Sequence, residues 1–328
     1  MYHIIINPIA GRGRTIHRLP ILTKLFDSHG LTYEAHITTG LMDGYEKAKR
    51  FCESGKDCKG IIGIGGDGTF QEIAAGMVDS YPHGQKIPIP LGIFPAGSGN
   101  DFIMTLEGGK SIALAKYKKD IEMAAKNFFE TLHRGKTRSI DVITANGMAF
   151  LNIGNLGLDA RIVDNAAALK PKYGRQAYVA AVYKSIAKHK NIPLTIEANG
   201  EKWDKQYTLV AICNGQYYGG GLHITPGAKI DDGKITLCLI EAMSRPKTMV
   251  LFPTLMMGQH VKLKPVKFIE CENLVITLPP GKETLCLDGN LYPDCNVEHP
   301  QPEKKSDRKT DRIRLEFKIL PRVLDVFV

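Results

Sequence analysis

The first 135 residues alternate short apolar runs with longer stretches in which apolar residues recur every three or four positions. The short runs predict buried strands, and the longer stretches predict amphipathic helices. The predicted strands are 2–7, 32–38, 60–64 and 91–94, and the predicted helices are 15–29, 44–52, 69–77 and 120–133. Because alternating strands and helices form a parallel sheet covered on both faces, the first half is predicted to be a doubly wound α/β domain.

After Gly135 the pattern changes to short segments with the two-residue alternation of half-buried strands. We expect these strands at 138–144, 148–153, 193–198, 207–214, 234–240, 267–278 and 313–319, and helices at 174–190 and 245–257. Such runs indicate an antiparallel sandwich. A chain of 328 residues also exceeds the size that one hydrophobic core usually serves. The sequence therefore predicts two domains, at residues 1–135 and 136–319.

The segment Gly65-Gly66-Asp67-Gly68-Thr69 joins a predicted strand to a predicted helix. Glycines let the backbone approach a polyphosphate, and the start of the helix offers unpaired N–H groups, with Thr69 as the expected N-cap. Asp67 would repel phosphate unless a metal ion, a ribose or neighbouring donors compensate its charge. Its presence indicates a nucleotide bound with Mg²⁺.

Two other interpretations of this loop are possible. Residues 63–68 also match G-x-G-x-x-G, but a dinucleotide site requires an acidic residue about 20 positions later, and the window 86–94 contains none. The second alternative is a purely structural glycine turn.

A second glycine-rich loop, 95–101, follows the next strand and reads Pro-Ala-Gly-Ser-Gly-Asn-Asp. In open α/β sheets, ligands bind at the carboxyl ends of the strands, so both loops are expected to face one crevice. Together the two loops resemble the catalytic domain of the diacylglycerol kinase and sphingosine kinase family, in its bacterial, YegS-like lipid kinase branch.

The resemblance extends over nearly the whole chain. Residues 4–13 are similar to the first strand of the family and its Asn-Pro-x-x-Gly turn, and Thr38 is similar to its nucleotide-contacting threonine. Segments 155–160, 172–178 and 214–233 resemble its linking segments and its second-domain signature. The resemblance implies a domain like those of NAD kinase and phosphofructokinase, followed by a lipid-binding β-sandwich, with residues 320–328 returning to the first domain.

The same resemblance implies an ATP-dependent lipid kinase that transfers the γ-phosphoryl group to a lipid hydroxyl, with diacylglycerol converted to phosphatidate as the favoured reaction. ATP and Mg²⁺ are the implied cofactors. The residues implied to bind the nucleotide, its metal ion and the acceptor are Asn7, Thr38, Gly65, Gly66, Asp67, Gly68, Thr69, Gly97, Ser98, Asn100 and Asp101.

Removal of a proton from the acceptor alcohol requires a carboxylate within hydrogen-bonding reach. Asp288 is the candidate general base, because Asp288-Gly289-Asn290 resembles the Asp-Gly-Glu motif of the family. The alternative is a plain turn between strands. Asn290 replaces the usual glutamate, and an amide cannot supply negative charge to a Mg²⁺–water network. Either this position is dispensable here or activity is weakened.

The resemblance also assigns Asp232 to a structural Mg²⁺, with backbone carbonyl oxygens of Lys229 and Lys234 as further ligands. Carboxylate and carbonyl oxygens suit Mg²⁺. A plain turn is the alternative for Asp231-Asp232-Gly233. The ten histidines show no paired metal spacing, which argues against zinc.

The net charge of +9, from 43 Lys+Arg and 34 Asp+Glu, fits either a solvated surface or attraction to anionic phospholipid. The basic residues considered for such attraction are Lys184, Lys188, Lys190, Lys262, Lys264 and Lys267. No recognised nucleic-acid motif accompanies the charge, so nucleic acid is not an expected partner. The expected partners are a lipid alcohol at a membrane surface and that anionic surface; a homodimer is left open.

The expected location is the cytoplasm, peripheral at the membrane. No apolar stretch approaches the roughly 20 residues that span a bilayer, and residues 1–12 do not resemble a signal peptide. Seven cysteines without C-x-x-C spacing are expected to be reduced. Two alternatives remain for function: an NAD kinase, which shares Gly-Gly-Asp-Gly-Thr, and a non-catalytic nucleotide or lipid sensor. The polar run 299–309 is expected to be an exposed loop.

Overall fold

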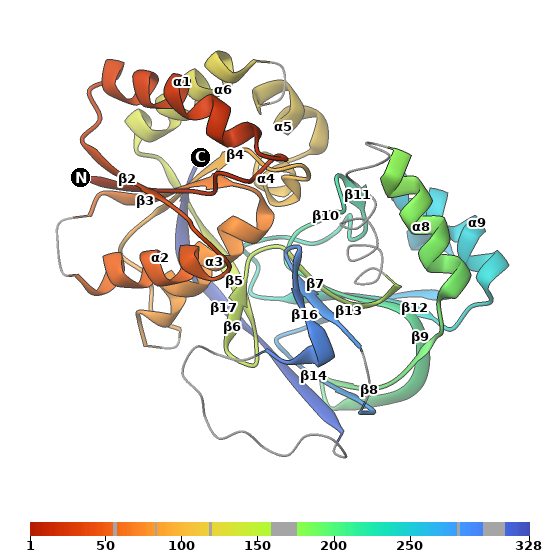
Figure 1. Ribbon diagram of the computed structural model, residues 1–328. Coiled ribbons are helices and arrows are strands. Elements are labelled where there is room, and N and C mark those ends of the chain that lie inside the picture. Colours follow the sequence, from red (N-terminus) through yellow and green to blue (C-terminus); the bar gives the residue numbers. More distant parts are fainter. Residues whose placement is uncertain (55–57, 83, 118–119, 159–175, 281–282, 298–311) are drawn as a thin grey trace.

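The computed structural model describes residues 1–54, 58–82, 84–117, 120–158, 176–280, 283–297 and 312–328. The expected loop at 299–309, residues 159–160 of the segment 155–160 and residues 172–175 of the segment 172–178 lie outside these ranges. Figure 1 shows two units, with the N-terminal strands and helices on one side and the antiparallel strands with two outer helices on the other.

The N-terminal unit is built on four parallel strands in the order β4-β3-β1-β2, as its alternating pattern predicts. The strands are β1 (Tyr2–Ile6), β2 (Tyr33–Ile37), β3 (Gly60–Gly65) and β4 (Leu91–Pro95). Successive residues of β1 face opposite sides of the sheet: Ile4 and Ile6 lie in one hydrophobic cluster and Ile5 in another. Both faces are therefore covered.

Helices α1 (Arg14–Ser28) and α6 (Ile121–Arg134) cover one face, and α2 (Asp43–Glu53) and α3 (Asp67–Asp79) cover the other. The predicted doubly wound α/β fold is confirmed. Two short helices, α4 (Asp101–Leu106) and α5 (Lys110–Tyr117), lie between β4 and α6. The apolar pattern did not predict α5, whose only fully buried residue is Ala113.

The C-terminal unit consists mainly of antiparallel strands, which confirms the predicted β-sandwich class. Its longer strands are β5 (Thr137–Ala145), β7 (Ile153–Gly157), β8 (Ile192–Ala198), β9 (Glu201–Cys213), β12 (Ile235–Glu241), β13 (Val266–Cys271), β14 (Asn273–Leu278) and β17 (Ile313–Phe327). Shorter elements are β6 (Met148–Phe150), β10 (Tyr217–Tyr218), β11 (Leu222–His223), β15 (Leu285–Leu287), β16 (Asn290–Tyr292), and the 3₁₀ turns η1 (Gln259–Lys262) and η2 (Pro293–Cys295).

Two predicted strands are each divided in two. The predicted strand 148–153 breaks at Leu151 and Asn152, whose N–H groups bond to a carboxylate instead of a neighbouring strand. The predicted strand 267–278 breaks at Glu272, because its halves pair with different neighbours: β13 with β12, and β14 with β8 and β17.

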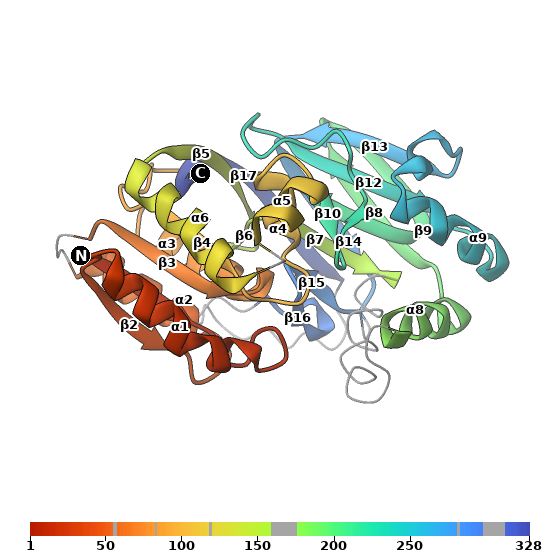
Figure 2. The same cartoon turned by 90° about the horizontal axis from the view of Figure 1, so that it is seen from above.

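Strand β17 joins the two units into one continuous sheet. It runs antiparallel to β5 along most of its length, and Val326 lies opposite Leu91 of β4 in parallel register. Its pairing with β5 shifts between Leu320 and Leu324, a stretch that contains Pro321, which has no N–H to donate. Figure 2 shows β17 running between the two units.

Helices α8 (Gln176–Lys188) and α9 (Arg245–Met256) pack over the outer face of the strands, at the end of the molecule distant from α1 (Figure 1). Their apolar residues contact alternate residues of β9 and β12, such as Ala211 and Cys238. Within the described ranges, no helix is both long and apolar enough to cross a membrane. None of the seven cysteines, all of which lie in the described ranges, forms a disulfide.

Candidate active site

The first glycine loop leads from β3 directly into α3. The helix begins at Asp67 with Gly66 as its N-cap, so the prediction that Thr69 is the N-cap is wrong. Thr69 lies in the first turn instead, where its hydroxyl accepts a hydrogen bond of 3.0 Å from Nδ2 of Asn7. A Cβ at Gly65 would lie 2.5 Å from that hydroxyl oxygen, so only glycine fits there.

The second glycine loop, after β4, packs backbone against backbone on the first. A Cβ at Gly97 would lie 2.5 Å from the Cα of Gly66. Asn100, with a φ of 57°, closes the loop by accepting from the N–H of Gly97 and donating to its carbonyl, at 2.9 and 3.1 Å. Ser98 is exposed at the tip. The two loops therefore form one surface of small residues next to the start of α3.

Asn7 and Thr38 directly follow β1 and β2, at the same edge of the parallel sheet. The N–H of Asn7 bonds to Ile64, and that of Thr38 bonds to Ile6, at 2.9 and 2.8 Å. The structure thus places all the predicted nucleotide-binding residues at the carboxyl ends of adjacent parallel strands, the region where α/β proteins bind ligands.

The negative charge of Asp67 is compensated by backbone N–H groups of the second loop and of the start of α4. Its Oδ1 accepts the N–H of Phe102 at 3.0 Å, in the first turn of α4. Removal from water raises the pKa of the Asp67 carboxyl, while the backbone donors at Phe102, Asp101 and Asn100 lower it. Its Oδ2 lies on the side of Gly99, where a Cβ would be 3.2 Å away. One carboxylate oxygen therefore ties Asp67 to the start of α4, and the other faces Gly99.

Asp101, the first residue of α4, connects the two units. Its carboxylate accepts the N–H of Gly220 at 3.0 and 2.9 Å, in the turn between β10 and β11. Burial raises the pKa of Asp101, and the neighbouring Asp67 raises it further. Nearby, Nζ of Lys110 donates to the carbonyl of Gly221 at 3.1 Å, and Thr105 accepts the N–H of Gln216 at 2.9 Å. Sequence patterns did not indicate Lys110 or Thr105.

Asp288 lies at the turn between β15 and β16 and is only 7% exposed. Its carboxylate accepts the backbone N–H groups of Leu151, Asn152 and Ile153, with the shortest distances 2.7 and 2.8 Å. Burial raises the pKa of Asp288 to about 7, although these donors lower it; the charge of Asp67 also raises it. The candidate base thus lies near the glycine loops, in an environment that favours its neutral form.

Asn290, two residues after Asp288, contacts the start of α3. Its Nδ2 donates to the carbonyl of Gly68 at 3.0 Å and to Oε1 of Gln71 at 2.6 Å. A Cβ at Gly68 would lie 2.6 Å from Oδ1 of Asn290, so glycine at 68 makes room for this contact. The residue that departs from the family motif is therefore part of the interface between the units.

The predicted Mg²⁺ site around Asp232 lies in an exposed turn, unlike the buried carboxylates near the glycine loops. Asp232 is exposed, and its Oδ1 accepts the N–H of Lys234 at 3.1 Å, the bond expected of a plain turn. Arg138 pairs with Asp231 through Nη2 at 2.7 Å, and the guanidinium of Arg322 donates to the Asp231 carbonyl. The role of Asp232, with carbonyl oxygens of Lys229 and Lys234, stays a prediction.

The chain matches two family models that together cover nearly all of it. The family model described as "Diacylglycerol kinase catalytic domain" matches residues 1–145, and that described as "YegS C-terminal NAD kinase beta sandwich-like domain" matches residues 153–328. The chain belongs to the YegS-like lipid kinase family.

Individual relatives support the same family assignment. The chain is 25% identical to a diacylglycerol kinase of Mycobacterium tuberculosis over 303 residues, which covers 92% of this chain and 90% of the relative. It is 26% identical to a diacylglycerol kinase of Bacillus subtilis over 322 residues, covering 94% and 98%. The crystal structure of a diacylglycerol kinase from Bacillus anthracis strain Sterne has a TM-score of 0.65 at 19% identity, covering 99% and 96%, and shows the same fold. This member of the family is a lipid kinase.

Proposed function

We propose that this lipid kinase transfers the γ-phosphoryl group of ATP to the hydroxyl of diacylglycerol, which yields phosphatidate. Relatives that carry the name diacylglycerol kinase match more than nine tenths of the chain. The proposal rests mainly on one observation: Asp288, a buried carboxylate whose pKa is raised to about 7, lies near Asp67 at the start of α3.

The surface formed by the two glycine loops fits a nucleotide polyphosphate. A Cβ at Gly97 would lie 2.5 Å from the Cα of Gly66, and one at Gly66 would lie 3.2 Å from the Cα of Gly97, so the two loops approach as bare backbone that can come close to a bound group. The first turn of α3 presents N–H groups and the positive end of the helix dipole. Ser98, exposed after β4, and Thr38, which follows β2 at the same edge of the sheet, would contact other parts of the nucleotide.

Asp67 and Asp101 fit a Mg²⁺ ion that accompanies ATP. Mg²⁺ usually takes one or two carboxylates, with phosphate oxygens and water completing its ligands. When bound, the ion supplies positive charge to the transferred phosphate. Glycine at position 99 leaves room for both carboxylates, because a Cβ there would lie 2.8 Å from Oδ2 of Asp101 and 3.2 Å from Oδ2 of Asp67.

Asp288 would accept the proton of the acceptor hydroxyl. A base is most effective when its pKa lies near the working pH, which a value of about 7 satisfies. The three N–H groups of residues 151–153 hold the carboxylate in one orientation, so its position does not depend on a flexible side chain. Such fixed geometry reduces the entropy that the reacting groups lose on the way to the transition state.

The outer face of α8, α9, η1 and β13 fits contact with an anionic membrane surface. Six large hydrophobic side chains on or next to these elements are exposed: Tyr183, Val250, Met257, Val261, Leu263 and Phe268. Lys184 and Lys188 on α8, together with Lys262 and Lys264, are exposed beside them. Lys267 is different, because its Nζ pairs with Glu241 at 3.0 Å. Apolar residues with adjacent lysines are typical of proteins that bind at a lipid interface.

The experiment supplies the purified chain with γ-labelled ATP, Mg²⁺ and mixed micelles that contain one candidate acceptor at a time. We expect label in phosphatidate when diacylglycerol is present. Label in another lipid, such as a sphingoid base, would change the substrate but keep the lipid kinase assignment. Label in NAD⁺ alone would support an NAD kinase, and ATP binding without any transfer would support a non-catalytic sensor. Either of these two results would refute the proposal.

A further inference from the structure

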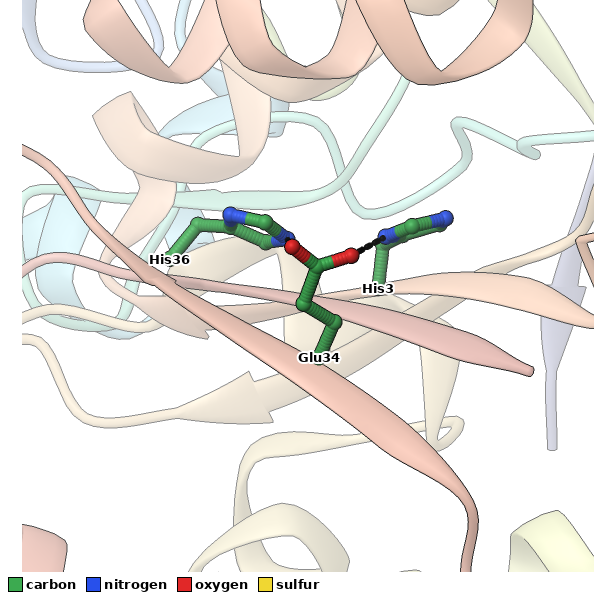
Figure 3. A group of neighbouring side chains, drawn as sticks. All are labelled: His3, Glu34 and His36. Atoms are coloured by element: carbon green, nitrogen blue, oxygen red, sulfur yellow. Dashed lines mark ion pairs between the residues drawn. The ribbon is translucent and has the colours of Figure 1, made fainter. Parts of the chain in front are cut away.

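Three side chains with metal-binding atoms converge on the edge of the parallel sheet, away from the glycine loops. They are His3 of β1 and Glu34 and His36 of β2, shown in Figure 3. His3 lies opposite Glu34 in the register of the two strands, and His36 is two residues beyond Glu34. Since residues two apart share a face of a strand, all three side chains extend from the same side of the sheet.

The distances among these side chains suit one small cation. Nδ1 of His3 lies 3.6 Å from Oε2 of Glu34, and Nε2 of His36 lies 3.7 Å from Oε1. One ligand atom from each residue lies within 4.8 Å of the others. In a tetrahedral site with metal bonds of about 2.1 Å, the ligand atoms are about 3.4 Å apart. Each carboxylate–imidazole distance is therefore close to that of a formed site, but the two distances involve different oxygens of Glu34, so a small turn of the carboxylate would complete the ligand set.

Aromatic packing holds both imidazoles in place. The His3 ring stacks on Phe51 with centroids 4.1 Å apart and planes 7° apart, and the His36 ring lies 4.5 Å from the same phenyl ring. The side chains of His3 and His36 are 3% and 13% exposed, whereas that of Glu34 is 55% exposed. The group is thus ordered on its inner side and open to water on its outer side, where a fourth ligand could bind.

We propose that His3, Glu34 and His36 bind one divalent transition-metal ion, with Zn²⁺ the best match to two imidazole nitrogens and one carboxylate oxygen. Mg²⁺ and Ca²⁺ prefer oxygen ligands and are poor matches. The site is separate from the Mg²⁺ proposed to accompany ATP. Spacing along the chain gave no sign of it, because His3 comes from a different strand than the other two residues.

Charges around the group set limits on its affinity. Glu34 supplies one negative charge, and two cations lie on the adjacent helix α2. Lys47 is paired with Asp43, and the guanidinium of Arg50 lies 5.4 Å from the centre of the Phe51 ring. These cations oppose a bound metal ion, and the ligand set contains only one anion, so binding is expected to be weaker than at cysteine-rich zinc sites.

A metal ion bound by these three residues would stabilise the edge of the sheet. Strand β2 is the last strand in the order and pairs only with β1 in the described part of the sheet. A metal bound by residues of both strands would restrain β2, which ends one residue before Thr38. The ion would therefore stabilise the folded state and order a strand that leads into the glycine-loop crevice.

The test uses metal-free full-length chain, prepared with a chelator, and titrates it with ZnCl₂ by calorimetry. We expect one Zn²⁺ per chain at this site, a Zn²⁺-dependent rise in melting temperature, and at least a tenfold loss of affinity in Glu34→Gln and in His36→Gln. Glu34 is largely exposed, so Glu34→Gln should fold normally, as its circular dichroism will show. The matched control is His133→Gln, because the exposed ring of His133 lies 6.3 Å from that of His29 and, among the described residues, neither belongs to a group of potential metal ligands.

CoCl₂ provides a second reading that does not depend on stability. Tetrahedral Co²⁺ bound by nitrogen and oxygen should give visible absorption in the parent and in His133→Gln, but not in Glu34→Gln. Absence of Zn²⁺ binding by the parent would refute the site. Equal binding by the parent and both site variants would place the ion elsewhere, for example at the partly exposed thiols Cys52 and Cys58, and would also refute it.

Discussion

Asn290 donates a hydrogen bond of 2.6 Å to Oε1 of Gln71, across the interface between the β15–β16 turn and helix α3. The Nε2 of Gln71 in turn donates to the carbonyl of Ala149 at 2.7 Å, and Nδ2 of Asn290 also donates to the carbonyl of Gly68. Because both carbonyls can only accept, the orientation of each amide is fixed. The structure thus uses Asn290 as a donor, a role that glutamate cannot fill at neutral pH.

We expect Asn290→Glu, which restores the usual family residue, to destabilise this chain instead of improving it. A carboxylate would leave Oε1 of Gln71 and the carbonyl of Gly68 without their donor, and each such loss costs about 1–3 kcal/mol when the group is buried. Urea unfolding of the parent, Asn290→Glu and Asn290→Asp will measure the cost. Asn290→Asp is the matched control, because it removes the donor without adding length. Higher stability and turnover in Asn290→Glu would contradict this account.

Asp288→Asn should reduce turnover of lipid phosphorylation by at least the roughly 10²-fold expected for loss of a general base, with little change in ATP affinity. The asparagine has nearly the same size, but it cannot accept the proton of the acceptor alcohol. Its NH₂ group would also face a backbone N–H of residues 151–153, so circular dichroism of the variant checks that it folds. Steady-state rates with diacylglycerol micelles, together with ATP binding, make the measurement. Asp294→Asn is the control, since Asp294 is an exposed aspartate a few residues away. Near-normal turnover in Asp288→Asn would remove this residue from the mechanism.

The pH dependence of the reaction should follow the ionisation of Asp288. Burial raises the pKa of this carboxyl to about 7, so below that pH the base is protonated and inactive. We expect kcat/KM to rise with pH through a midpoint near 7 and then to level off. The residual activity of Asp288→Asn should lack this rise. A profile that is flat between pH 5 and 9 in the parent would show that another group removes the proton.

The glycine loops were predictable because their chemistry is local. Gly65 to Thr69 and Gly97 to Asp101 each follow a short apolar run, and parallel strands place such loops at one edge. The sequence also predicted the residue ranges of most strands. A continuous apolar run such as Ile4, Ile5 and Ile6 is what a strand buried on both faces requires. Local pattern and global fold agree here, as they do in sequences that fold reliably.

Contacts between distant segments were not predictable. The carboxylate of Asp288 is held by N–H groups of residues 151–153. Because almost every residue type has a backbone N–H, the sequence does not reveal which residues donate. The bonds from Lys110 and Asp101 to the β10–β11 turn depend on how the two units pack. His3 and His36 come together only through strand pairing. In each case tertiary packing, not local pattern, determines the chemistry.

Asp232→Ala should change the Mg²⁺ dependence of activity if Asp232 binds a structural ion, while secondary structure stays the same. In the structure its carboxylate also accepts the N–H of Lys234, so some loss of turn stability is expected as well. Activity against Mg²⁺ concentration and circular dichroism of the same samples separate the two effects. Asp231→Ala is the comparison, because it removes the ion pair with Arg138 instead. Identical Mg²⁺ curves for parent and Asp232→Ala would leave this residue with a turn-forming role alone.

The last prediction concerns the exposed lysines near α9 and their attraction to a membrane surface. Activity toward diacylglycerol should rise when anionic phospholipid is added to neutral vesicles, because each basic residue near such a surface contributes about 1 kcal/mol of attraction. The rise should shrink with added salt, since the Debye length falls from about 10 Å at 0.1 M to about 3 Å at 1 M.

Reversing the charge of selected lysines tests which part of the protein surface is attracted to anionic lipid. Lys262 and Lys264 are exposed beside the apolar residues Val261 and Leu263, so the double variant Lys262→Glu, Lys264→Glu should lose most of the stimulation. Lys24→Glu, Lys126→Glu makes the same change in net charge on exposed positions of α1 and α6, at the other end of the molecule, and should keep it. If both double variants lose stimulation equally, overall charge and not the α9 face attracts the chain to the lipid. If the parent does not respond to anionic lipid at low salt, the basic residues behind the net charge of +9 are simply solvated and do not attract the protein to lipid.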